Sequence, residues 1–527
     1  DAGKSGAAKN GKDAKPAAGD APKLDRVGEP AVTFASVARE FPHGAFVIDL
    51  AQPGSRLARA LLECDRSVDT AFARIQLEKF ARNAKRGKSA PREGYDFYDI
   101  TAWALPVTYG VPAYALAERP EGGVTLVAPD PNTADDATET LPDSLAIGIP
   151  VTARVSRAGP LTLRDAEGRI AFDCRGRVAG GEARNAYVWS CAQDGAARLA
   201  LRLMQEGFRV ATATRPLRAE NADFPRGSFL ARVERNPAAL HARMNSLAAA
   251  CGVTVIAVQS AWTDRGDTGV GSEAIAAIKA PRIAVVVDRP VSPESYGWLW
   301  FLLERRLGVR FTAVRASALS AVELDRYNVL VIPDGSGGAL SGAMGGTLPA
   351  LKSWIARGGA LVCLDDAAEF PAIKANGLST ARIVGVKEKK EGDKDDDEAP
   401  LDSAAAEAQR RPEPVPGTIF WVTLDPLHFL SWGFTSARIP VLEGGNTFLT
   451  PSREGANPMM FDRTPLTVAG WTWPDTERRL ALTAYAVDEP TGAGHVILIA
   501  GSPAFRLFWR NTERLVTNAI IYSQAAF

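Results

Sequence analysis

Histidine and cysteine are scarce in this chain, and neither is arranged in a recognisable metal-binding motif. The 527 residues include four histidines and five cysteines. No histidine lies in an H-x-x-E, H-E-x-x-H or H-x-H pattern, and no two cysteines are spaced as C-x-x-C. A catalytic zinc needs three protein ligands, usually histidines with a carboxylate, and a zinc ribbon needs paired cysteines. We therefore expect this chain by itself to hold no metal and no cofactor.

The chain also lacks an excess of one charge and a long apolar run. It has 61 basic and 61 acidic residues, and thus a formal net charge of zero. Proteins that bind nucleic acid usually carry a basic excess, and a helix that crosses a bilayer needs roughly 18 consecutive apolar residues. We expect neither a nucleic-acid partner nor a transmembrane segment. The length predicts about two to four domains, because one hydrophobic core rarely grows to this size.

The cysteines do not determine the compartment. Cys174 and Cys191 could form a disulfide in an oxidising environment, but buried free thiols are the favoured interpretation. The chain begins at Asp1, inside a linker-like tract, without an initiator methionine or the apolar stretch of a signal peptide. We therefore expect a further portion of the protein upstream of Asp1.

Two tracts of biased composition interrupt the chain and indicate where its domains begin. Residues 1–32 are rich in alanine, glycine, lysine and aspartate, so they bury too little surface to offset the entropy lost on ordering. Residues 387–416 are densely charged and predict a solvated insertion. The rest divides into an α/β unit that ends an upstream domain (33–118), a small β-rich module (119–183), a second α/β unit (184–280), and an α/β domain that carries the insertion (281–527).

Buried strands alternate with helices in the second half of the chain. Apolar runs at 283–287, 327–333 and 360–364 are separated by segments of helical periodicity. Strands separated by helices at this spacing are typical of an open parallel sheet with helices on both faces. The predicted fold class is therefore multi-domain α/β, with open parallel sheets flanked by helices and a small β-rich module.

One phrase, F-P-x-G-[A/S]-F, occurs twice, beginning at Phe41 and at Phe224. In both copies a proline follows, and an Ala-Arg pair lies at the same spacing after that proline, at Ala58-Arg59 and at Ala242-Arg243. We interpret the phrase as a turn into a buried strand that is followed by a helix. In the second copy Asn236 is placed to cap that helix, and Gly252 is placed to end it.

Cys363 is the candidate nucleophile of the predicted sheet, because it lies near the end of a strand. A nucleophile at a strand-to-helix elbow is exposed above the sheet edge, but such an elbow needs small neighbours. Val362 and Leu364 suit the interior of a buried strand instead. We therefore favour a structural role for Cys363 over a catalytic one.

Acidic and glycine-rich residues follow two of the predicted strands. Asp365, Asp366 and Glu369 come after the strand at 360–364, where they face solvent or begin a helix. The glycine-rich segment 335–338 could in principle hold a phosphate, but it matches neither the P-loop spacing nor the dinucleotide-binding spacing. A flexible loop is the favoured interpretation of this segment.

Aromatic residues gather in three phrases that contain Trp103, Trp432 and Trp509. Such residues could line a groove that binds carbohydrate or peptide. They could equally pack domains against one another, because tryptophan carries a large apolar surface. We favour packing, and keep these three tryptophans as candidate binding residues.

Several long phrases resemble one bacterial protein family. They are GAFVIDLAQP, FYDITAWALP, AYVWS, FPRGSF and GSPAFRLFWRNTERL. They resemble the region that follows the peptidase domain in large bacterial zinc carboxypeptidase-like proteins. Residues from Pro281 onward resemble the class I glutamine amidotransferase-like domain of that family, which is related to the trehalose-utilisation type. The resemblance covers nearly all of the chain beyond Pro30.

The resemblance implies that this chain is the non-catalytic C-terminal portion of a secreted metallocarboxypeptidase-like protein. It would support or cap an upstream peptidase domain or subunit and help to bind a peptide substrate, in the periplasm or outside the cell. The zinc belongs to the peptidase domain, whose H-x-x-E motif and distant histidine have no counterpart here. The amidotransferase-like domain also lacks the elbow-cysteine context and the late H-x-E motif of its namesake.

Two other functions stay open at this point. The chain could be a free-standing subunit that binds peptide or cell-wall material through its aromatic phrases. It could also be a hydrolase or amidotransferase that uses Cys363. The substrate and the oligomeric state do not follow from the sequence.

Overall fold

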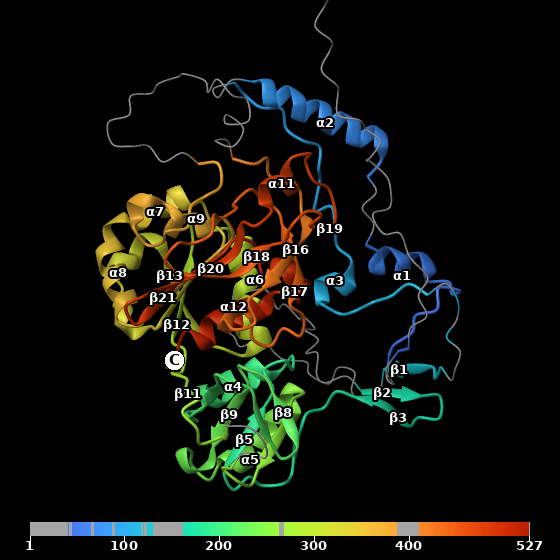
Figure 1. Cartoon of the computed structure of the whole chain (residues 1–527), viewed down its shortest axis with the longest axis vertical. Coiled ribbons are helices and arrows are strands. Elements are labelled where there is room, and N and C mark those ends of the chain that lie inside the picture. Colours follow the sequence, from blue (N-terminus) through green and yellow to red (C-terminus); the bar gives the residue numbers. More distant parts are fainter. Residues whose placement is uncertain are drawn as a thin grey trace, which may run out of the picture. The chain divides into compact units, whose positions relative to one another are not determined.

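The computed structural model describes most of the chain beyond residue 40 (Figure 1). The described residues are 40–41, 45–64, 68–86, 90–116, 118, 120, 124–129, 162–262, 268–386 and 411–525. The predicted linker at 1–32 and residues 387–410 of the predicted insertion lie outside them. Contacts divide the chain into one unit of residues 1–35 and 65–96 and a second unit of residues 36–64 and 97–527.

Helix α2 (Thr70–Lys85) lies in the first unit. Asp69 begins it, because its side chain accepts a hydrogen bond from the Phe72 N–H at 2.9 Å. The Lys79 ammonium pairs with the Asp96 carboxylate at 2.6 Å, which ties the helix to the segment that follows it. Exposed pairs of this kind contribute only about 0–1 kcal/mol each.

A ten-stranded sheet forms the centre of the second unit. Its parallel part has the order β13 (Phe311–Arg315), β12 (Ile283–Val287), β14 (Val329–Ile332), β15 (Ala360–Leu364), β21 (Gly494–Ile499). Its antiparallel part continues with β20 (Ala484–Thr491), β18 (Ala456–Phe461), β16 (Thr418–Leu424) and β17 (Arg438–Glu443), and β19 (Thr467–Ala469) pairs with β16.

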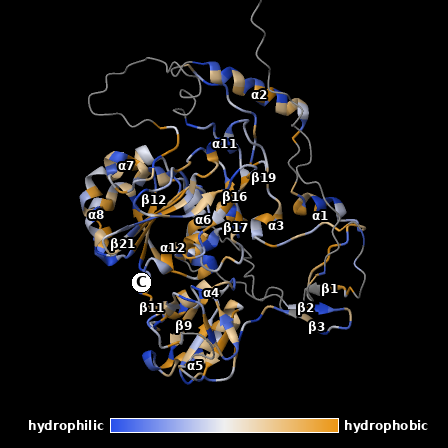
Figure 2. Cartoon of the chain, viewed as in Figure 1, coloured by the Kyte–Doolittle hydropathy of each residue, from blue (hydrophilic) through white to orange (hydrophobic). Residues whose placement is uncertain are grey.

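Helices lie on both faces of the parallel part of this sheet, as Figure 1 shows. On one side are α7 (Gly337–Met344), α8 (Leu348–Ala356) and α9 (Glu369–Ala372). On the other are α6 (Pro293–Trp300), which continues as a π-helix (Phe301–Leu307), and α12 (Glu513–Tyr522). Figure 2 shows that the strands between these helices are mainly hydrophobic, as two covered faces require.

A second, six-stranded sheet lies before residue 281. Its order is β11 (Ile275–Ala277), β6 (Ala211–Ala213), β9 (Phe229–Arg232), β5 (Ala186–Trp189), β10 (Thr254–Val258), β4 (Arg177–Ala179). It packs with α4 (Ala196–Gln205) and α5 (Leu240–Cys251). Here the β10–β4 pair is parallel and the others are antiparallel. The predicted parallel pairing therefore holds for one part of the larger sheet, from β13 to β21, and not for this smaller sheet.

Smaller elements complete the described structure. A three-stranded antiparallel sheet falls within the predicted β-rich module and contains β1 (Val127–Pro129), β2 (Thr162–Asp165) and β3 (Ile170–Asp173). The others are α1 (Ser55–Leu62), α3 (Leu105–Tyr109), the hairpin of β7 (Leu217–Ala219) and β8 (Ala222–Phe224), and α11 (Thr476–Leu480). None of the helices described is long and apolar enough to cross a membrane.

The two copies of the repeated phrase have different structures. In the second copy Phe224 ends β8, and a turn with a φ of +81° at Gly227 leads into β9. In the first copy residues 45–50 form no strand, and residues 42–44 lie outside the described residues. The prediction of a buried strand is therefore wrong for the first copy, whose described residues pair with no strand, whereas β9 after the second copy pairs with β5 and β6.

The helix after the second copy begins later than predicted. Helix α5 starts at Leu240, and Asn236 does not cap it. The Asn236 side chain instead accepts a hydrogen bond from the Arg209 N–H at 2.7 Å and so ties α5 to the end of α4. Gly252 ends the helix with a φ of +70°, as predicted.

The two sheets share one hydrophobic core. Tyr522 of α12 stacks on Phe229 of β9 with ring centroids 5.5 Å apart, and its hydroxyl donates to the Gly227 carbonyl at 2.6 Å. The last helix of the larger domain is therefore also part of the core of the smaller one. Cys174 and Cys191 are not joined to one another, so the disulfide considered from the sequence is not formed.

Candidate functional site

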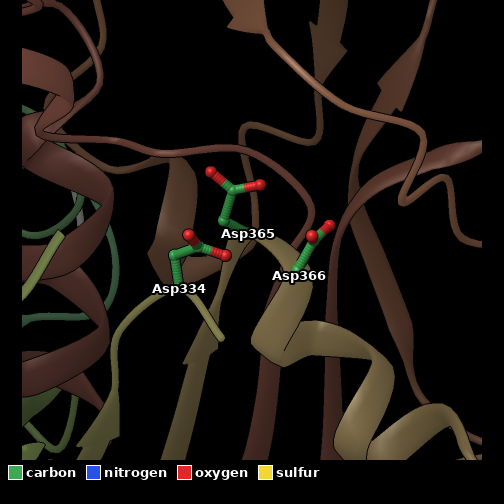
Figure 3. A group of neighbouring side chains, drawn as sticks. All are labelled: Asp334, Asp365 and Asp366. Atoms are coloured by element: carbon green, nitrogen blue, oxygen red, sulfur yellow. The ribbon is translucent and has the colours of Figure 1, made fainter. Parts of the chain in front are cut away.

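Three aspartates meet at the carboxyl ends of two adjacent parallel strands (Figure 3). Asp334 follows β14, and Asp365 and Asp366 follow β15. One carboxylate oxygen of each lies within 4.8 Å of the other two. In open α/β sheets ligands bind outside the carboxyl ends of the strands. We call these three side chains the carboxylate centre.

The start of α6 holds Asp334 in place. The Asp334 N–H donates to the Ser295 hydroxyl at 3.1 Å, and the Asp334 carbonyl accepts from the Ser292 N–H at 2.8 Å. Ser292 is also the N-cap of α6, since its hydroxyl accepts from the Ser295 N–H at 3.2 Å. The same two serines therefore begin the helix and position the aspartate.

The turn after β15 holds Asp365 in an uncommon conformation. Its φ is +55°, which residues other than glycine rarely adopt. Its N–H donates to the Gly501 carbonyl at 3.2 Å, and Gly501 follows β21. A strained strand-to-helix turn of this kind exposes its side chain above the sheet edge. In this chain the residue so placed is Asp365, two positions after the cysteine considered from the sequence.

Burial and like charge raise the pKa values of two of these carboxyl groups. Burial, followed by the charge of Asp366, raises the pKa of Asp334 to about 6. Burial, followed by the charges of Asp334 and Asp366, raises the pKa of Asp365 well above its usual range. Both shifts favour the protonated, neutral forms of these two carboxyl groups.

A fourth acid lies beneath the centre. Glu443, the last residue of β17, is 1% exposed, and its Oε1 has no hydrogen-bond partner among the described residues. Burial, followed by the charges of Asp365 and Asp366, raises its pKa. A Cβ built on Gly501 would lie 3.0 Å from this oxygen and 2.9 Å from the Tyr485 hydroxyl. Glu443 and Tyr485 therefore converge on the backbone that binds Asp365.

On one side of the carboxylate centre, an acid and a base form an ion pair, and a hydroxyl group donates to Asp366. The Thr447 hydroxyl donates to Asp366, and the Arg411 guanidinium forms an ion pair with Glu369. Burial lowers the pKa of Arg411, although the nearby charge of Asp366 opposes this shift. Asp366 is therefore positioned by a side chain, whereas Asp334 and Asp365 are hydrogen-bonded by backbone N–H groups, including that of Asp366.

The donor set determines which metal the centre fits. It consists of carboxylate oxygens and contains no histidine or cysteine. Zinc in proteins prefers nitrogen and sulfur ligands, whereas Mg²⁺ and Ca²⁺ take oxygen ligands. The zinc that the family resemblance implies therefore does not fit these residues, in agreement with its assignment to a separate peptidase domain.

The candidate nucleophile is inaccessible. Cys363 lies in β15 with no exposed surface, and burial strongly raises the pKa of its thiol. A thiol needs a lowered pKa and access to substrate in order to attack. The structure therefore gives Cys363 the packing role that we favoured from its neighbours.

The glycine-rich segment 335–338 is ordered as the start of a helix. Ser336 caps α7 by accepting from the Ala339 N–H at 3.5 Å, and Gly337 is the first helical residue. A Cβ on Gly337 would lie 2.3 Å from the Glu369 side chain. The prediction of a flexible loop is wrong, because these glycines allow α7 to pack closely against α9.

The three candidate tryptophans lie in different environments. Trp103 is 51% exposed, whereas Trp432 is 6% exposed and Trp509 is fully buried. The Trp432 ring packs edge-on against Tyr522 at 4.9 Å, and Trp509 packs with residues of β16, β17 and β19. A stacking ligand needs an exposed ring face, so the structure favours packing for the two buried tryptophans. Ligand binding at Trp103 stays a prediction.

Comparisons with known proteins give structural similarity only. No protein-family model matches the chain, and no curated protein matches its sequence. Similar solved structures include a glutamine amidotransferase from Thermotoga maritima, with 8% identity and a TM-score of 0.27 over 42% of this chain and 74% of that one. They also include a ThuA-like protein from Parabacteroides merdae, with 9% identity and a TM-score of 0.30 over 46% of this chain and 88% of that one.

A β-galactosidase from Bacillus circulans sp. alkalophilus is similar over 46% of this chain and 31% of that one, with 11% identity and a TM-score of 0.26. Identities of this size concern the fold alone. The part of the family resemblance that names a glutamine amidotransferase-like fold has one such neighbour by name, at a TM-score of 0.27. The part that names a zinc carboxypeptidase stays a proposal.

Proposed function

We propose that this chain, contrary to the expectation from its sequence that it holds no metal, binds a hard divalent cation, Mg²⁺ or Ca²⁺, through Asp334, Asp365 and Asp366. Three carboxylate oxygens within 4.8 Å of one another are close enough to share one ion. Burial, followed by the charges of the neighbouring carboxylates, raises the pKa values of Asp334 and Asp365, and a bound cation would favour their ionised forms. The cation would join two strand ends at the edge where open α/β sheets bind ligands.

The observation that carries this proposal is the unpartnered Oε1 of Glu443. A buried carboxylate without a hydrogen bond or a counter-charge is costly and is rarely left so in folded proteins. Its pKa responds to the charges of Asp365 and Asp366, so it lies next to the carboxylate centre. A cation held by the three aspartates would also lower the cost of this fourth acid.

Cation binding can be tested on protein that has been freed of metal with a chelator. Titration with MgCl₂ and CaCl₂ in a calorimeter should show saturable binding, and the melting temperature should rise with cation concentration. Asp365→Asn and Asp366→Asn should abolish both effects. Asp194→Asn, a change at an exposed aspartate outside the centre, should leave both unchanged. If the parent protein and the three variants bind the cations equally well and show the same rise in melting temperature, the proposal is wrong.

We also propose that the chain serves as an accessory region for a peptidase domain, in the periplasm or outside the cell. The family resemblance supports this role, and so does the burial of Cys363, which removes the most obvious nucleophile of the sheet. Metal analysis of the chain alone should find no stoichiometric zinc. Activity on peptides that persists in this chain alone would contradict the accessory role without bearing on the Mg²⁺ or Ca²⁺ site.

A further inference from the structure

A second candidate site lies at the opposite edge of the large sheet. A groove of about 540 Å³ opens at the amino ends of β12, β13 and β14. Its lining includes three arginines, Arg202, Arg282 and Arg310, and the aromatic residues Phe311 and Tyr327. Pockets for small molecules usually measure about 300–1,000 Å³, so the groove is large enough for more than a single ion.

The arginines of this groove are not neutralised. None of the three forms an ion pair within the described part of the chain. The acidic lining residue, Glu206, is bound by Arg243, whose Nε and Nη2 donate to its two oxygens at 2.5 and 2.6 Å. That pairing lowers the pKa of Glu206 and keeps it ionised, but its charge is already balanced.

A second nearby carboxylate is balanced in the same way. The Arg282 guanidinium donates to the backbone carbonyl of Asp325 at 3.4 Å. The Asp325 side chain instead pairs with Arg357, which does not line the groove, at 2.7 Å. The groove therefore keeps about three positive charges, and guanidinium groups are the preferred partners of phosphate and carboxylate anions.

Local packing holds two of these arginines in position. Gly308 ends the π-helix with a φ of +69°, and a Cβ at this residue would lie 2.7 Å from Nη1 of Arg202. The Gln205 amide donates to the Gly308 carbonyl at 3.0 Å and accepts from the Arg310 N–H at 3.1 Å. This orientation of the amide satisfies both backbone groups. The end of α4 is thus tied to the segment that carries Arg310, which organises the groove in advance of a ligand.

We propose that this groove binds a free phosphorylated small molecule, with its phosphate groups on the arginines and an apolar part against Phe311 and Tyr327. The cluster of three guanidinium groups favours a ligand with several negative charges over a monoanion. The size of the groove and its two aromatic residues favour a ligand that is larger than phosphate itself. Nucleic acid also carries phosphate, but the balanced charge of the whole chain does not favour it.

The test uses inorganic pyrophosphate, ADP and adenosine as probes in calorimetric titrations of the whole chain. We expect saturable binding of pyrophosphate, tighter binding of ADP, and none of adenosine. Arg202→Gln and Arg310→Gln should each weaken ADP binding about tenfold or more, as expected for loss of a charge-assisted contact. Arg453→Ala, a change at an exposed arginine outside the groove, should have no effect. Unchanged melting temperatures would show that the variants are folded.

Three outcomes would overturn the proposal. The first is no binding of pyrophosphate or ADP, and the second is equal binding by the control and the groove variants. The third is a DNA duplex or an anionic lipid vesicle that binds more tightly than ADP and displaces it. If Arg202→Gln and Arg310→Gln unfold the chain, the Phe311→Leu variant tests the proposal in their place. It should weaken ADP binding and leave pyrophosphate binding unchanged, and equal ADP binding by this variant and the parent protein would overturn the proposal.

Discussion

At Asp365 the backbone turns with a φ of +55°, a conformation that costs about 1 kcal/mol or more for a residue with a Cβ. Its carboxyl group shares a small volume with Asp334, Asp366 and Glu443, and all of these groups are acidic. Backbone strain and uncompensated charge at one strand end are unfavourable for stability alone. Both fit a site whose ligand supplies the missing positive charge.

Gly501 should tolerate no larger residue. A Cβ there would lie 2.9 Å from the Tyr485 hydroxyl and 3.0 Å from Oε1 of Glu443, both held in the core. Gly501→Ala should therefore lower the free energy of unfolding by about 1–3 kcal/mol through overpacking. Urea denaturation measures this change. Gly271→Ala is the control, because a Cβ there meets no atom within 4 Å, and an equal loss in both variants would contradict the expected collision.

Asp334 should make the metal-free protein less stable as the pH rises. Its pKa is raised to about 6, so the protonated form is favoured in the folded state and stability is lost as the pH rises from about 4 through 6. Asp334→Asn removes this loss. The variant should be more stable than the parent at pH of about 8 by about 1–2 kcal/mol, after allowing for partial exposure, and should match it below about pH 4.

Urea denaturation in the presence of a chelator measures this dependence. At high pH, saturating Mg²⁺ or Ca²⁺ should make the parent protein more stable than Asp334→Asn. The parent protein can bind the ion, and the variant binds it less well. If the parent protein instead becomes more stable relative to the variant as the pH rises from about 4 to 8, the sign of this prediction is wrong.

At the scale of elements, one buried acid connects three segments. Asp488 of β20 is 2% exposed and accepts hydrogen bonds from His428 at 3.1 Å and from His495 of β21 at 2.9 Å. Burial opposes its ionisation, but these two bonds outweigh burial and lower its pKa. His428 also begins the short 3₁₀ helix Phe429–Ser431, since its Nδ1 accepts from the Leu430 N–H.

Asp488→Asn should therefore loosen β20, β21 and the segment of His428 together. We expect a loss of about 2–3 kcal/mol in the free energy of unfolding, typical for removing the charge from a buried hydrogen-bonded network. Asp194→Asn, a change at an exposed aspartate away from this network, is the control. Thermal unfolding compares the variants, and a change below about 0.5 kcal/mol for Asp488→Asn would show that the network contributes little.

At the scale of the molecule, α12 joins the two sheets. Tyr522 lies 5.5 Å from Phe229 and 4.9 Å from Trp432, measured between ring centroids, and it has 1% exposure. Its hydroxyl bonds the Gly227 carbonyl, in the turn where a Cβ would meet Trp432 at 2.7 Å. The second copy of the repeated phrase thus provides the surface on which the last helix packs.

Tyr522→Ala should separate the unfolding of the two sheets. The parent protein should unfold residues 184–280 and 281–525 in one transition, because they share a core. The variant should lose about 3–5 kcal/mol and show two transitions by differential scanning calorimetry. Tyr522→Phe, which keeps the ring, should lose only about 0.5–1.5 kcal/mol and keep a single transition. One transition in Tyr522→Ala would show that other contacts suffice to couple the sheets.

The sequence by itself determined the elements that depend on local patterns. The apolar runs identified β12, β14 and β15, and glycine after the last helical turn identified the end of α5. The antiparallel pairing in the smaller sheet could not be predicted from the sequence. A buried apolar strand has the same sequence pattern in parallel and antiparallel sheets. Only the tertiary structure decided that pairing.

The candidate site divides in the same way. Asp365 and Asp366 were recognisable as acids after a buried strand, and the neighbours of Cys363 indicated a buried thiol. Asp334 is 31 positions before Asp365, and Glu443 and Gly501 are farther still along the chain. The groove arginines likewise come from three distant segments. Asp334, Asp365 and Gly501 meet because the adjacent parallel strands β14, β15 and β21 end on the same side of the sheet. Glu443 and the groove arginines reach their sites through tertiary packing of other segments. No local sequence pattern encodes this long-range pairing and packing.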